Sequence, residues 1–243
     1  MNETRAAAEK AVINYRTPYM QYKKLYWMIS KDLLSECRSL RVWPAMLLLG
    51  VVVALMFAMQ TDLPPDRLRQ IVGGLLWLTI FFAGTLALDR SFAAEREDGC
   101  WEGLLCYPVS PTTVYLAKLT VNVVALAALE CVLIPLFAIL TDVPLVAHPG
   151  PIIAVAVLGN LGLAAVGTLL SAVANTGRQS SYLLPLLVLP TVIPLVLGAA
   201  EATRLAVEHD FGPAWWRWVQ LLAGFTIVFI TAGIVLFEFA VEE

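Results

Sequence analysis

The sequence contains little charge and little histidine. Asp, Glu, Lys and Arg make up 14% of its 243 residues and His occurs twice, whereas 59% of the residues are hydrophobic. Soluble domains are about 45 to 50% apolar. The apolar residues also form long uninterrupted blocks and not the stripes of a half-buried helix or strand. These shortages exclude a water-soluble enzyme with a single core, and the blocks predict an all-α, polytopic membrane protein.

Several motifs that carry chemistry are absent from the sequence. It has no GxxxxGK[ST] loop, no HExxH or GxSxG motif, and no paired carboxylates on its polar segments. We therefore expect neither an ATP site nor a catalytic centre in this chain. The four cysteines show no CxxC spacing, and Cys100 and Cys106 have no nearby histidine. No metal site and no structural disulfide is expected from them.

Six apolar blocks each approach the roughly 20 residues that cross a bilayer as a helix. They predict a six-span domain over 42–243, with spans at 42–59, 71–88, 120–140, 151–175, 182–200 and 219–240. No cleavage site follows the first block, so we expect it to remain in the membrane. Eight of the 16 Lys and Arg residues precede it. Because basic residues stay on the cytoplasmic side, both termini are predicted to be cytoplasmic.

Residues 1–41 are expected to form a cytoplasmic tail that contains an amphipathic helix. Thr17 and Pro18 fit an N-cap followed by a proline in the first turn. One face of the helix is aromatic and apolar, and the other is basic, with Lys23, Lys24, Lys31 and Arg38. Such a helix lies in the headgroup layer of the inner leaflet. Packing on a partner subunit is the alternative interpretation.

The segment 89–112, between the second and third spans, is the most patterned polar stretch. Asp98 and Gly99 predict a turn, and a short helix is expected to follow and to end at Pro108. Ser110 and the proline after it predict the N-cap and first residue of the third span. We therefore predict a short, rigid cytoplasmic helix between two defined breaks.

This short helix fits a coupling helix that docks on a soluble motor protein. Trp101 and Leu104 would fill a groove on the motor, and Glu102 would meet basic residues at its rim. A plain amphipathic loop on the membrane surface is the other interpretation of the same residues.

Two of the polar residues within the predicted spans are candidates for a functional role. An ionisable group at the bilayer centre costs about 2.5 to 3.5 kcal/mol on insertion scales and is usually retained for a reason. Glu130 lies mid-span, so we expect it to face a cavity or a neighbouring helix. A protonated acid that bonds only across helices is the alternative. Asn160, which has glycine neighbours, predicts close helix packing, with a functional role as the alternative.

Three prolines, Pro185, Pro190 and Pro194, interrupt the fifth span. Pro190 and Pro194 each remove a backbone donor, which only protein neighbours or water can compensate at membrane depth. The fifth span is therefore predicted to be bent or broken.

Two segments carry the patterns of a known family. The first reads LDRSF at 88–92, then EDGCWEGL at 97–104, Pro108, and LAK at 116–118; the second reads LLVLPTVIPL at 186–195. Together they resemble the membrane subunits of six-span ABC-type exporters, and within these the heme exporter protein B family of bacterial cytochrome c maturation. Glu130 departs from this resemblance, because an apolar residue is expected there.

The resemblance implies a bacterial inner-membrane protein without its own ATPase site. Its partners would be a separate ABC ATPase subunit that holds the ATP, a heme-handling membrane subunit, a periplasmic heme chaperone and the lipid bilayer, but no nucleic acid. The resemblance assigns helix movement to Pro190 and Pro194. It assigns ATPase coupling to Arg90, Asp98, Gly99, Glu102, Leu104 and Pro108. The roles of Trp101 and Glu130 rest on the residue patterns alone.

No cofactor is assigned to this chain, although the complex would handle heme. The predicted outer loops contain His148, His209 and a tryptophan cluster with Trp215 and Trp216. Tryptophans at a span end usually form an interfacial belt. Heme-handling membrane proteins also have tryptophan-rich outer segments, so heme contact at these four residues is a second interpretation. The Asp that follows such tryptophans is missing here.

Two other functions fit the same sequence. One is a general ABC exporter permease for a lipid, a drug or a polysaccharide, and the other is a scaffold that holds the ATPase without transporting anything. The sequence leaves open whether the chain pairs with itself or with a different membrane subunit.

The substitution Glu102→Lys tests the coupling interpretation. It places a positive charge against a basic rim, so we expect the chain to lose most of its association with the ATPase subunit. Co-purification of the two subunits measures this. Unchanged co-purification would contradict the assigned role of Glu102.

Overall fold

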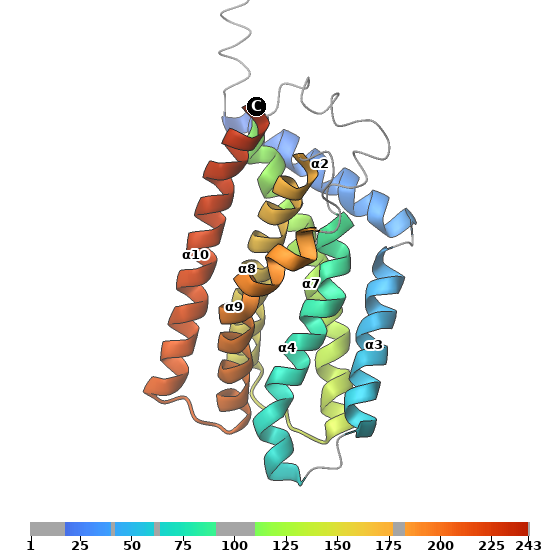
Figure 1. Ribbon diagram of the computed structural model, residues 1–243, viewed down its shortest axis with the longest axis vertical. Coiled ribbons are helices and arrows are strands. Elements are labelled where there is room, and N and C mark those ends of the chain that lie inside the picture. The colour runs from blue at the N-terminus through green and yellow to red at the C-terminus, as the bar shows by residue number, and fades with distance from the viewer. Residues whose placement is uncertain (1–17, 40–41, 61–63, 91–109, 177–182, 243) are drawn as a thin grey trace, which may run out of the picture.

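The computed structural model describes residues 18–39, 42–60, 64–90, 110–176 and 183–242. Every regular element in these ranges is a helix, which confirms the all-α prediction. The elements are α2 (Pro18–Ser39), α3 (Val42–Gln60), α4 (Pro65–Arg90), α7 (Pro111–Thr141), α8 (Pro149–Thr176), α9 (Leu183–Val207) and α10 (Pro213–Glu242). Figure 1 shows α3 to α10 side by side in one bundle, with α2 crossing one of its ends.

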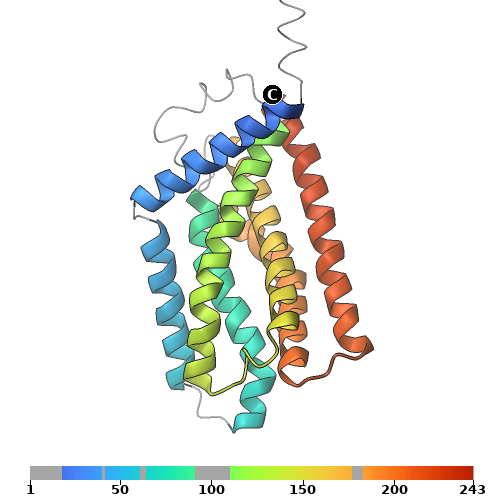
Figure 2. The same ribbon diagram turned by 180° about the vertical axis from the view of Figure 1, so that it is seen from behind.

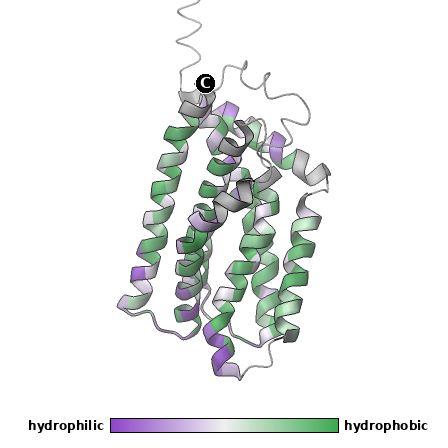
Figure 3. Cartoon of the chain, viewed as in Figure 1, coloured by the Kyte–Doolittle hydropathy of each residue, from purple (hydrophilic) through white to green (hydrophobic). Residues whose placement is uncertain are grey.

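The bundle has the length and polarity of a membrane-spanning domain. Five helical segments are long and apolar enough to cross a membrane, within α4, α7, α8, α9 and α10. The first predicted span, 42–59, falls on α3, whose apolar part, Trp43–Met59, is shorter. Figure 3 shows hydrophobic residues along the middle of the helices and hydrophilic residues gathered toward the ends. The chain is a multi-pass membrane protein.

Helix ends follow local signals that hydropathy alone does not capture. Ser110 caps α7 as predicted, because its side chain accepts a hydrogen bond from the Thr113 amide at 3.3 Å and Pro111 occupies the first turn. The span predicted at 120–140 therefore extends to 111–141. α9 likewise continues beyond the predicted end at residue 200 to Val207.

The fifth predicted span is a continuous helix, with Pro185 in its first turn and two further prolines in its interior. Pro190 and Pro194 both lie inside α9 and are exposed. Each proline deprives the carbonyl four residues earlier of its usual amide donor. Figure 1 shows α9 starting obliquely across the bundle and then turning along it.

Glycines allow two close helix contacts around α4. A Cβ atom on Gly73 would overlap the backbone carbonyl oxygen of Ala200 in α9. A Cβ atom on Gly159 in α8 would overlap the ring of Trp77 in α4. The Trp77 indole also donates a hydrogen bond to the Thr203 hydroxyl at 3.0 Å. Small residues thus bring α4, α8 and α9 together at backbone distance.

The helix α2 crosses the bundle end where the C-terminus lies (Figure 2). We call this the α2 end, and the end with residues 142–148 and 208–212 the opposite end. Tyr26 and Trp27 are 68% and 65% exposed and so point away from the bundle. The side of α2 that faces the bundle includes a buried acid, Asp32, which the prediction of one apolar and one basic face did not include.

Adjacent glycines in α4 provide a matched test of this packing. Gly73→Ala would place a methyl group against a backbone carbonyl that cannot move aside, so we expect a loss of about 1 to 3 kcal/mol in stability. Gly74→Ala meets no atom within 4 Å. It should leave stability unchanged or raise it, because Ala favours the helix over Gly by about 0.8 to 1 kcal/mol.

Thermal unfolding of the purified chain in detergent compares the two variants. Equal unfolding midpoints for Gly73→Ala and Gly74→Ala would contradict the close approach of α4 and α9.

Candidate functional site

The predicted coupling residues lie almost entirely outside the described residues. This holds for Asp98, Gly99, Trp101, Glu102, Leu104 and Pro108. Arg90 is the last residue of α4, and Ser110 precedes the first residue of α7. The two ends of the coupling segment are thus described, and the segment itself remains a sequence prediction.

A buried ion pair joins α2 to α7 near this segment. The Lys118 ammonium lies 3.0 Å from Asp32 Oδ2, and the two side chains are 7% and 9% exposed. Lys31 lies 3.3 Å from the other carboxylate oxygen, but its own side chain is 66% exposed. Removing one partner from a buried pair leaves an uncompensated charge, which is strongly destabilising. The Asp32–Lys118 pair therefore fixes how α2 crosses α7.

The contact between Asp32 and Lys118 was not predicted from the sequence. Lys118 lies between hydrophobic residues, within two turns of the start of α7, and such a charge in an apolar run signals a buried partner. Asp32 occupies the side of α2 that packs on the bundle. Only the crossing of the two helices brings these residues together.

The two intramembrane polar candidates contact each other. The Asn160 side-chain amide donates a hydrogen bond to Glu130 Oε2 at 2.7 Å. Glu130 is 5% exposed and Asn160 is 3% exposed. The other carboxyl oxygen, Glu130 Oε1, and the amide oxygen, Asn160 Oδ1, are buried without a hydrogen-bond partner among the described residues. The predicted contact of Glu130 with a neighbouring helix is confirmed, and the pair has two unused acceptor positions.

A cavity of about 390 Å³ adjoins this pair between α7 and α8. Its walls are almost wholly apolar. They consist of Ala127, Cys131, Ile134, Pro135, Leu145, Val146, Pro149, Ile152, Ile153, Ala156 and Val157, together with Glu130 and Asn160. Glu130 therefore faces both a cavity and a neighbouring helix, the two settings that the sequence predicted for it.

Other polar contacts hold α7 and α8 together away from the cavity. The Asn122 amide donates to the Thr168 hydroxyl at 2.8 Å. The Tyr115 hydroxyl donates to the Ala165 carbonyl at 3.4 Å. The α7–α8 contact thus contains several polar pairs, and the pair at Glu130 adjoins the cavity.

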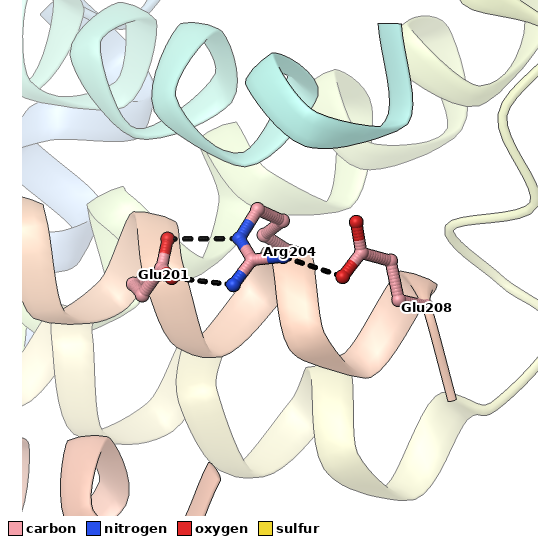
Figure 4. Close-up of polar contacts among 3 residues, drawn as sticks. All are labelled: Glu201, Arg204 and Glu208. Atoms are coloured by element: carbon pink, nitrogen blue, oxygen red, sulfur yellow. Dashed lines mark hydrogen bonds and ion pairs between the residues drawn. The ribbon is translucent and has the colours of Figure 1, made fainter. Parts of the chain in front are cut away.

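A charged cluster lies in the last turns of α9, at the opposite end of the bundle (Figure 4). Arg204 forms two bonds with the Glu201 carboxylate and a third with Glu208. Bidentate pairs of this kind are geometrically specific and charge-assisted. They let α9 carry three charged residues beyond the span that hydropathy predicted.

The four candidates for heme contact lie together at this same end. The rings of His148 and His209 meet at right angles with 4.3 Å between their centroids. His148 also packs on Phe211, at 5.9 Å between ring centroids. Trp215 packs edge-on against Trp216, with centroids 5.2 Å apart. Because the two histidine rings touch, no flat group can lie between them in this arrangement.

Local backbone geometry places His209 against its partner ring. His209 has φ 61°, and the Asp210 amide donates to the Leu205 carbonyl at 2.9 Å. This is a Schellman-type helix end, in which glycine usually takes the left-handed position. A left-handed residue other than glycine costs about 1 to 2 kcal/mol. Neither ring belongs to a described group of three or more His, Cys, Asp or Glu side chains suited to a metal ion.

A small pocket of about 280 Å³, lined mostly by polar residues, adjoins His209. Its walls come from the start of α4 and the end of α9, with Asp66, Arg69, Gln70, Pro144, Val207, Glu208 and His209. The opposite end of the bundle therefore combines paired charges, aromatic rings and a shallow polar recess.

Comparison with known proteins places this architecture in a family. The sequence profile of the CcmB protein family matches residues 23–242. The chain is 32% identical over 143 residues to heme exporter protein B of Rhodobacter capsulatus, covering 59% of this chain and 65% of that protein. It is 31% identical over 137 residues to heme exporter protein B of Paracoccus denitrificans, covering 56% and 62%. The chain thus spans less than two thirds of the length of these two relatives.

A third relative is matched over a longer stretch. Heme exporter protein B of Bradyrhizobium diazoefficiens is 28% identical over 159 residues, which cover 65% of this chain and 70% of that protein. The family profile covers the chain from within α2 to the end of α10. On this coverage, the chain belongs to the CcmB protein family.

Proposed function

We propose that this chain is the permease subunit of an ABC-type heme exporter complex that acts in bacterial cytochrome c maturation. The observation that carries the proposal is the family match over residues 23–242, which includes every span of the bundle. ATP is hydrolysed by a separate ATPase subunit, and this chain converts the closure of that subunit into movement of its spans. The bundle lies in the inner membrane with the α2 end toward the cytoplasm.

The connection between α4 and α7 supports this mechanical role. Both helices border the coupling segment, and Ser110 fixes the start of α7. The Asp32–Lys118 ion pair then ties α7 to α2 about two turns further on. A force on the coupling segment therefore moves the start of α7 and α2 together.

The bundle interior supports movement of whole helices. Its buried polar groups bond between helices, as in Trp77 with Thr203 and Asn122 with Thr168. Such bonds hold neighbouring spans as units, since each donor that lost its partner within the membrane would be costly. We infer that the complex works by shifting helix groups against one another.

The opposite end of the bundle would face the periplasm. We propose that the exposed tryptophan and histidine surface there, with Trp216 56% exposed, lies next to the heme-handling subunit and the heme chaperone. Amphipathic rings of this kind suit a membrane interface and a transient protein contact alike. Heme is the cargo of the complex.

A heme-peroxidase stain tests the proposed function. Membrane and periplasmic proteins from cells that lack this gene should lose every covalent heme band, and a plasmid copy should restore the bands. Normal bands without the gene would overturn the maturation role and favour an exporter of another substrate. A plasmid copy with Glu102→Lys, compared by the same stain, reports whether ATPase coupling is required.

The two lysines beside Asp32 provide a matched test of force transmission. Lys118→Met leaves a buried carboxylate facing α7, so we expect stability to fall by about 3 to 5 kcal/mol. Lys31→Met removes an exposed partner of the same carboxylate, which should cost less than about 1 kcal/mol.

The double variant Asp32→Leu/Lys118→Met separates folding from function. Removing both charges should recover most of the lost stability, because no unpaired charge remains. Thermal unfolding and ATP-dependent activity of the complex are measured on the same preparations. A stable double variant with full activity would show that the pair serves folding alone.

A further inference from the structure

The cavity beside Glu130 combines two polar side chains with otherwise apolar walls, as small-molecule binding sites do. Its volume of about 390 Å³ falls in the range of about 300 to 1,000 Å³ that small-molecule pockets occupy. Such pockets are mostly apolar and contain a few polar groups that orient the ligand. Here the polar groups are Glu130 and Asn160.

The base of the cavity contains unused hydrogen-bonding capacity. Glu130 and Asn160 are each at least 95% buried, and each has one side-chain oxygen without a partner. Pro135, which also lines the cavity, has no amide N–H, so the Cys131 carbonyl lacks its usual helical donor. A buried acceptor without a partner is costly, and hydrocarbon cannot supply a donor. A bound group that donates at this position would remove that cost.

The depth of the pair points to the bilayer as the source of the ligand. Glu130 lies eleven residues before the end of α7 and Asn160 eleven residues after the start of α8. At 1.5 Å per residue both are about 16 Å from the opposite end, which is close to the middle of a hydrocarbon core about 30 Å thick. The cavity walls extend from this depth to residues 145–149.

The cavity opens sideways between two helices. Cys131 is exposed at its edge, and Ile153 and Val157 are 58% and 50% exposed. These apolar residues lie on the part of the bundle that faces the hydrocarbon, so an apolar molecule can enter from the bilayer. Figure 2 shows α7 and α8 next to each other on this side of the bundle.

We propose that this cavity binds a membrane amphiphile through a hydroxyl head group held by Glu130 and Asn160, with its hydrocarbon tail along α7 and α8 toward residues 145–149. A hydroxyl group has one donor hydrogen and an oxygen that accepts. It donates to Asn160 Oδ1 and accepts from Glu130 Oε1 when that oxygen carries the proton of a neutral carboxyl group, so both oxygens gain a partner. A transmembrane helix from another protein fits less well, because its backbone amides are already bonded within the helix.

Photolabelling of the purified full-length chain tests the proposal. The probe is dodecan-1-ol with a diazirine in its chain, in nanodiscs of dioleoylphosphatidylcholine, and the control probe is the methyl ether of the same molecule. Mass spectrometry then maps the labelled peptides. We expect the alcohol to label residues 127–135 and 145–160 about tenfold more than the ether, since the ether has no donor for the two oxygens.

Variants distinguish a head-group site from a general apolar groove. Glu130→Leu and Asn160→Leu should lower alcohol labelling about tenfold, to the level of the ether. Asn122→Leu removes a buried polar pair from the same two helices away from the cavity and should leave the labelling unchanged. Glu130→Gln keeps the side-chain size and presents an NH2 donor, so labelling should persist. Unlabelled dodecan-1-ol should compete with the probe in the unmodified chain.

Two results would overturn the proposal. Equal labelling by alcohol and ether, or alcohol labelling that Glu130→Leu leaves intact, would reduce the cavity to a groove that takes any apolar chain. Loss of labelling in native membranes, with Cys131 crosslinking to another protein, would show that a partner helix covers the cavity. The binding readout does not depend on heme export, so failure here leaves the proposed function to its own test.

Discussion

A polar side chain at membrane depth needs a partner within the protein, because the surrounding hydrocarbon supplies no donor or acceptor. The contact between α7 and α8 is organised by this requirement. In α7, Glu130 lies eight residues after Asn122. In α8, their hydrogen-bond partners are the same distance apart in the reverse order, because Asn160 lies eight residues before Thr168. Two separate hydrogen bonds thus specify one register, whereas apolar packing alone would tolerate a shift of one helix along the other. The cavity adjoins only the second of these bonds, between Glu130 and Asn160.

The spans were predictable from the sequence because their signal is local. A block of apolar residues identifies a span whatever its neighbours are, and Ser110 with Pro111 identifies the start of α7. The limits of α9 were not predictable in this way. Glu201 and Arg204 look polar enough to end a span, but each neutralises the other on the same helix face. Hydropathy counts the two charges and not their pairing.

The candidate site was predictable only one residue at a time. Glu130 and Asn160 stood out because polar residues are rare in spans, but nothing in the sequence joins residue 130 to residue 160 across two helices. Asp32 was missed for a related reason. Amphipathicity divides α2 into a basic face and an apolar face, and an acid that faces the bundle belongs to neither. Its role depends on where α7 crosses, which is a property of the tertiary structure.

The length of α7 has a mechanical consequence. It is one helix of 31 residues, and its hydrogen bond from Asn122 to α8 lies about 16 Å from its capped start and about 12 Å from Glu130. If α7 tilts as a rigid rod about that bond, the two arms move in opposite directions. A displacement of Pro111 then moves Glu130 in the opposite direction by roughly three quarters of that distance. Under such leverage, pressure at one membrane surface would widen or narrow a space near the midplane.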